Sequence, residues 1–126
     1  RAGDIRAGGR AAIRAQPMHP ANAKRFPEAV RAELGADAEL IDPEGASLSL
    51  EVTLPRAGVR ERLRGNRTPV LMVNGRWERK FQPHADWAER TVPRLRRVDL
   101  EGGHSINVER AAEFDAAVIG FLTDRV

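Results

Sequence analysis

Two short apolar segments in the C-terminal half of the chain each lead into a loop that carries an ionisable side chain. Residues 68–75 are followed by Glu78, and residues 95–103 are followed by His104. A continuous apolar run after a proline is typical of a strand buried in a parallel sheet. If both segments form neighbouring parallel strands, their C-terminal loops open at one edge of the sheet, where open α/β folds place their ligands. The sequence therefore predicts that a carboxylate and an imidazole meet at this edge.

The segments around these two strands have helical patterns. Residues 84–92 predict a short helix that Pro93 ends. Polar residues in the strand at 95–100 place it nearer the sheet edge than the strand at 70–73, which we expect to be buried on both faces. The order strand, helix, strand, helix requires a right-handed parallel crossover. The last helix is predicted from one apolar stripe at helical spacing, formed by Phe114, Ala117, Val118, Phe121 and Leu122.

The first part of the chain, up to residue 66, reads as helical and irregular. Residues 5–16 are rich in alanine and arginine, but Gly8 and Gly9 weaken any helix there. Pro27 suits the first turn of a second helix, which we expect Gly35 to close.

The stretch that follows carries two competing signals. Asp42 and Pro43 form a helix start, with the aspartate as cap and the proline at the first helical position. Residues 47–54 alternate between apolar and polar side chains, which predicts a strand.

Charge and hydropathy limit the possible partners. The formal net charge of +3 is small for 126 residues, and acidic residues are interspersed among the arginines. No apolar run approaches the ~20 residues of a transmembrane helix, so we expect no membrane partner and a cytoplasmic location. The densest basic cluster lacks aromatic interleaving and any nucleic-acid motif, so we expect no nucleic-acid partner; it consists of Arg60, Arg62, Arg64 and Arg67.

The residues that usually bind metals or form disulfides are sparse. Cysteine is absent, so the sequence has no disulfide and no thiolate nucleophile. His19, His84 and His104 lie far apart and form no metal-ligand spacing, so we expect neither a metal nor another cofactor. The chain begins with Arg1 rather than Met and its first third lacks a strong strand, so we expect a C-terminal fragment of a larger protein.

Taken together, residues 68–75, Glu78, the Gly-Gly-His segment 102–104 and the amphipathic C-terminal helix resemble the C-terminal part of an α/β-hydrolase. In that family a strand ending in Gly-x-x-Asp supplies the acid of a catalytic triad, and a later Gly-His loop supplies the base. The resemblance implies an α/β fold in which a helical lid segment, residues 1–66, precedes the strand-helix-strand-helix part of a parallel sheet, residues 67–126.

The same resemblance implies that His104 is the general base and Glu78 the triad acid of a hydrolase that cleaves an ester or related bond of a small molecule. Glu78 stands where the family usually has aspartate, and Ser-His-Glu triads are known. No Gly-x-Ser-x-Gly occurs in the sequence, so the nucleophile, a serine or an aspartate, is expected upstream. This segment alone is then expected to be inactive. No motif indicates the substrate or the oligomeric state.

Several alternatives stay open at this point. Glu78 can instead pair with Arg79 or Lys80 on a solvated loop, with the acid coming from another strand upstream. The chain can also be a non-catalytic binding module that keeps the scaffold, since one fold hosts many functions. Glu109 is expected to favour the start of the last helix through the helix dipole. The other two histidines are expected in solvent or as helix caps, and Trp77 and Phe81 at a pocket mouth or over the core edge.

Overall fold

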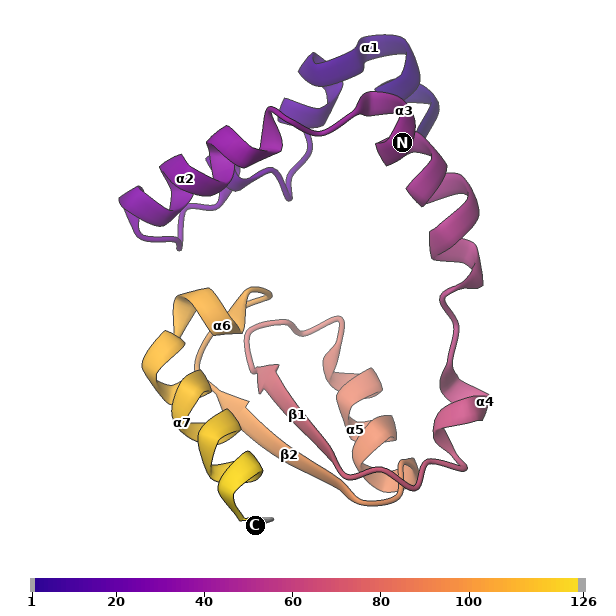
Figure 1. Cartoon of the computed structure of the whole chain (residues 1–126), viewed down its shortest axis with the longest axis vertical. Coiled ribbons are helices and arrows are strands. Elements are labelled where there is room, and N and C mark those ends of the chain that lie inside the picture. The colour runs from indigo at the N-terminus through magenta and orange to yellow at the C-terminus, as the bar shows by residue number, and fades with distance from the viewer. Residues whose placement is uncertain (1, 125–126) are drawn as a thin grey trace. The chain divides into compact units, whose positions relative to one another are not determined.

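The computed structural model describes residues 2–124, which divide after Gly58 into two compact units. The sequence predicts this division near residue 66. Figure 1 shows the first unit in indigo to magenta and the second in pink to yellow. A lid role for the first unit stays a prediction.

The first unit is entirely helical. Its elements are α1 (Ala2–Arg14), η1 (Pro20–Asn22), α2 (Glu28–Ala38), α3 (Pro43–Leu48), the π-helical turn η2 (Ser49–Thr53) and η3 (Leu54–Arg56). The weak point expected in α1 is present, because Gly9 has φ 55° and ψ −139° and interrupts the helix. Such a backbone conformation is open to glycine and strained for other residues. The helix α1 packs against α3 (Figure 1), and buried Ile5 and Ile13 supply the apolar contacts of α1.

The strand predicted at residues 47–54 is wrong, and the competing helix start is correct. The side chain of Asp42 accepts a hydrogen bond from the N–H of Gly45 at 2.6 Å and caps α3. Helical backbone then continues to Arg56. Ser47 is fully buried, and its hydroxyl lies 3.1 Å from the carbonyl oxygen of Ala2 and 2.9 Å from that of Pro43.

The helix α2 also departs from its predicted end. It runs past Gly35 to Ala38, because Gly35 does not take the left-handed conformation with which glycine ends helices.

The second unit has the predicted strand-helix-strand-helix order. It contains α4 (Arg60–Leu63), β1 (Val70–Gly75), α5 (Gln82–Thr91), β2 (Leu95–Leu100), α6 (Ile106–Glu109) and α7 (Ala111–Thr123). The strands β1 and β2 pair in parallel, in a register that runs from Val70 opposite Leu95 to Gly75 opposite Leu100. The helix α5 lies on one side of this pair and α7 on the other (Figure 1).

The core of the second unit is small. Ala85, Val92 and Ile106 are buried, whereas residues 70–73 of β1 are only partly buried, which corrects the prediction of a strand buried on both faces. The physical reason is that the described residues supply a sheet of two strands, which leaves one edge of each strand without a neighbour. Among residues 2–124, no helix is long and apolar enough to cross a membrane.

Candidate active site

Glu78 and His104 meet where the two parallel strands end. Glu78 lies in the loop after β1 and His104 in the loop after β2, and the parallel pairing opens both loops at the same edge. The Nδ1 atom of His104 lies 3.4 Å from Oε2 of Glu78, with the two side chains 68% and 28% exposed. This separation is slightly longer than a good hydrogen bond.

A close backbone approach brings the two loops together. A Cβ atom on Gly75 would lie 2.1 Å from the carbonyl oxygen of Gly103 and 2.8 Å from that of Gly102, so no other residue fits there without a shift. The N–H of Trp77 donates to the carbonyl oxygen of Gly102 at 2.9 Å. The separation between the loops is therefore fixed by main-chain contacts rather than by the two ionisable side chains.

The side chain of Gln82 fixes the loop that carries Glu78. Its Nε2 donates to the carbonyl oxygen of Gly75 at 3.0 Å and to that of Glu78 at 3.3 Å. Its Oε1 accepts from Nδ2 of Asn74, also at 3.0 Å. The first turn of α5 thus holds both ends of the loop.

The structure is similar to that of MenH from S. aureus, with a TM-score of 0.85 and 22% sequence identity over 98% of this chain. MenH is an α/β-hydrolase, and the matched region is 49% of its chain. The chain has the α/β-hydrolase fold. It spans about half the length of MenH. No family model and no curated protein matches the sequence.

Next to the pair, the α/β-hydrolase fold is braced by a polar network centred on Arg97. Its guanidinium contacts Asp99 of β2 at 2.8 Å, Asp86 of α5 at 2.7 Å and Glu89 of α5 at 3.2 Å. These carboxylates, Asp99 first, raise the pKa of Arg97 well above its usual range. Burial alone would raise the pKa of Asp99, but hydrogen bonds from Arg97 and Asn74 outweigh it and lower that pKa. The network ties α5 to the strand pair just behind the site.

One aromatic side chain lies against the imidazole, and a second lies in the loop that carries Glu78. The ring of Phe81 lies 5.6 Å from that of His104, at an interplanar angle of 50°. Trp77 donates from Nε1 to Glu101 at 3.1 Å, and both aromatic residues are about half exposed. Within residues 2–124, neither Arg79 nor Lys80 forms an ion pair with Glu78, which favours His104 as its partner.

Sequence reasoning missed the role of Glu109 at this edge of the α/β-hydrolase fold. Glu109 ends α6, and its Oε2 accepts a 2.8 Å hydrogen bond from the N–H of Gly103, next to His104. The last helix, α7, begins only at Ala111. The signal for this contact in the sequence is a glutamate shortly after a Gly-His loop. It indicates the contact once the loop geometry is known.

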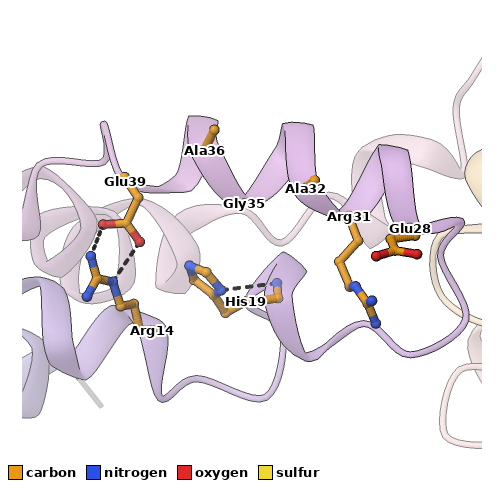
Figure 2. A pocket seen from close by; sticks show the side chains of 9 residues that line it. Arg14, His19, Glu28, Arg31, Ala32, Gly35, Ala36 and Glu39 are labelled. Atoms are coloured by element: carbon orange, nitrogen blue, oxygen red, sulfur yellow. Dashed lines mark hydrogen bonds and ion pairs between the residues drawn. The ribbon is translucent and has the colours of Figure 1, made fainter.

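The first unit of this α/β-hydrolase fold contains an open pocket of about 780 Å³ (Figure 2). His19 is buried at its side, and its Nδ1 accepts from the N–H of Ala21 at 3.2 Å, so it caps η1 as expected. The lining holds no hydroxyl or thiol and consists of Arg14, His19, Ala21, Glu28, Arg31, Ala32, Gly35, Ala36 and Glu39.

The remaining histidine lies in α5, where two arginines of the basic cluster contact the helix. The Nδ1 of His84 lies 2.7 Å from a guanidinium nitrogen of Arg60. Arg60 and Arg64 stack over the ring of Trp87, at 4.6 and 5.7 Å from its centroid. Within residues 2–124, His, Asp and Glu side chains form no group of three or more that suits a metal ion.

Proposed function

We propose that His104 and Glu78 are the general base and the acid of a hydrolase triad that cleaves an ester or related bond of a small molecule. The supporting observation is the 3.4 Å contact between Nδ1 of His104 and Oε2 of Glu78. It lies at the C-terminal ends of adjacent parallel strands, where open α/β sheets bind ligands.

The orientation of the imidazole fits this role. Because Nδ1 faces Glu78, the other ring nitrogen, Nε2, is left to take a proton from a nucleophile and to return it to the leaving group. The carboxylate of Glu78 accepts the Nδ1–H, fixes the tautomer and stabilises the imidazolium that forms. The high exposure of the His104 side chain, 68%, leaves room for a nucleophile to approach.

The nucleophile in this proposal lies outside the chain. The sequence contains no Gly-x-Ser-x-Gly, the turn that presents the serine in α/β-hydrolases. A serine there would form an acyl-enzyme that His104 helps water to hydrolyse. An aspartate would instead attack a saturated carbon of a halide or epoxide substrate, releasing halide or opening the ring, and water activated by His104 would hydrolyse the resulting alkyl ester. In either case the chain alone has the base and the acid but does not turn over substrate.

The test uses the protein in which this sequence is joined to its nucleophile. Hydrolysis of p-nitrophenyl acetate and butyrate is measured for the wild type, for His104→Ala and for the control His84→Ala. We expect His104→Ala to lower kcat by about 10³-fold or more, because the proton acceptor is lost. His84 is exposed and outside the pair, so its variant keeps wild-type turnover. Equal turnover in both variants would remove the triad.

A second candidate is a non-catalytic binding module, favoured by the absence of the nucleophile motif from the sequence. Labelling with a fluorophosphonate, which reacts with activated serines, separates the candidates when a serine is the nucleophile. Covalent labelling that depends on His104 supports the hydrolase. For an aspartate nucleophile, mass spectrometry of the trapped ester intermediate in His104→Ala serves the same purpose.

A further inference from the structure

We infer that Glu109 is a positioning residue for His104: its carboxylate fixes the backbone of the loop that presents the imidazole. This inference rests on the proposed function for its catalytic consequence. The contact that supports it is the 2.8 Å hydrogen bond from the N–H of Gly103 to Oε2 of Glu109.

The loop needs such a support because of its composition. Gly102 and Gly103 precede His104, and neither has a side chain that could anchor the loop by packing. Glycine also has the widest backbone freedom of all residues. Both glycines are nevertheless buried, so their peptide groups must find partners inside the protein.

Two hydrogen bonds hold this glycine pair. In the first, the carbonyl oxygen of Gly102 accepts from the N–H of Trp77, in the loop that carries Glu78, at 2.9 Å. In the second, the N–H of Gly103 donates to Glu109 at the end of α6. The first contact joins the base loop to the acid loop, and the second joins it to the helix that follows.

The chain packs tightly at this point, which leaves little freedom to compensate for a lost contact. A Cβ atom on Gly102 would lie 2.4 Å from Cδ1 of Ile106 and 3.3 Å from Cγ of Arg110. The carboxylate of Glu109 itself would be 3.7 Å from that position. The loop therefore turns back directly onto α6, and the Glu109 side chain is only partly exposed.

The imidazole, by contrast, has few contacts of its own. It is 68% exposed and touches Glu78 and the ring of Phe81. Its direction is thus set mainly by the backbone on which it stands. Without an acceptor at residue 109, the Gly103 N–H is left unpaired in a buried position, and the peptide between Gly102 and Gly103 is held only through the Gly102 carbonyl oxygen.

The experiment follows the orientation of His104 by NMR in the full chain. The readouts are the nuclear Overhauser effect between the rings of His104 and Phe81 and the amide shift of Gly103. Glu109→Ala removes the acceptor, whereas Glu109→Gln keeps an amide oxygen for the same hydrogen bond. We expect loss of the ring-to-ring effect and an upfield amide shift in Glu109→Ala, and near wild-type values in Glu109→Gln.

Glu113→Ala is the matched control. Glu113 has the same charge and lies in the first turn of α7, but it pairs with Arg110 rather than with the loop. If Glu109→Ala does not fold, Glu109→Met keeps the length of the side chain without a carboxylate and is expected to give the same loss. Unchanged ring contacts in a folded Glu109→Ala or Glu109→Met would overturn the inference.

The kinetic consequence is tested in the protein that also holds its nucleophile. Glu109→Ala should lower kcat by about 10- to 100-fold with little change in KM, and Glu109→Gln should restore most of it. The NMR result does not depend on turnover. Retained activity in His104→Ala would therefore refute the triad alone, and intact ring contacts without the Glu109 carboxylate would refute the positioning role alone.

Discussion

Asn74 of β1 and Asp99 of β2 stand opposite each other in the parallel register, and Nδ2 of Asn74 donates to Oδ1 of Asp99 at 2.7 Å. The same carboxylate oxygen accepts from Arg97 at 2.8 Å. Arg97 in turn reaches the carboxylates of α5, so one polar cluster joins both strands to that helix. The edge that carries the candidate site therefore depends on a polar pair as well as on its small apolar core.

Removal of the Asp99 carboxylate should destabilise the second unit. Asp99→Ala leaves the Arg97 guanidinium, whose side chain is only 11% exposed, without one of its partners, and it removes one of the two hydrogen bonds that the Asn74 amide donates. We expect the free energy of unfolding to fall by about 1–3 kcal/mol in urea titrations. The exposed Asp115→Ala is the control and should stay within about 0.5 kcal/mol of wild type. Equal losses in the two variants would contradict the role of the cluster.

The lowered pKa of Asp99 also predicts how stability depends on pH. Its carboxyl binds protons less readily in the folded than in the unfolded state, so stability rises with pH between the two pKa values. The contribution is complete above the unfolded value of about 3.9 and is lost as the pH falls through the folded pKa. Melting temperatures recorded from pH 7 to pH 2 should drop less steeply for Asp99→Asn than for wild type. Parallel curves for the two proteins would argue against this linkage.

A methyl group on Gly75 should disturb both loops of the site. The Cβ atom of Gly75→Ala would collide with the carbonyl oxygens of Gly102 and Gly103, which belong to rigid main chain. We expect a loss of about 1–3 kcal/mol in stability, typical of overpacking, and a weaker contact between His104 and Glu78. Gly35→Ala is the contrasting variant, because its Cβ meets nothing within 4 Å and it lies within α2. That change should stabilise the chain by about 0.5–1 kcal/mol.

The charge of Glu78, and not only its hydrogen-bonding capacity, should matter to turnover. Glu78→Gln keeps the side-chain length but cannot stabilise an imidazolium, so we expect kcat to fall by about 10²- to 10⁴-fold. Glu78→Asp keeps the charge and matches the more common family residue, so its loss should be smaller. Steady-state kinetics on p-nitrophenyl butyrate, with the nucleophile present, compares the two. A fully active Gln variant would show that another group is the acid.

The sequence was sufficient to predict the second unit in some detail. Pro69 and Pro93 bound β1 and α5, and the apolar stripe of α7 has a helical period, so local signals agree with the final fold there. The parallel pairing then followed from chain order. The meeting of Glu78 and His104 was predicted because parallel strands end at one edge.

Elsewhere the local signals were ambiguous or silent. Residues 47–54 alternate like a strand, but the cap at Asp42 starts a helix and the described residues offer no strand with which to pair. Three alternating side chains stay exposed as a result, Leu48 at 46%, Val52 at 40% and Leu54 at 60%. The contact between Glu109 and Gly103 depends on how the chain turns at α6, which no spacing rule encodes.

The crossing of Gly75 with Gly102 and Gly103 has a consequence for how such a site can diversify. Since main-chain atoms set the distance between the two loops, the side chains of exposed neighbours such as Arg79, Lys80 and Asn107 are not required to maintain it. These positions are open to exchange by mutation or by directed evolution while the carboxylate and imidazole stay in register. These exposed loop positions can then acquire a new substrate selectivity while His104 and Glu78 keep their contact.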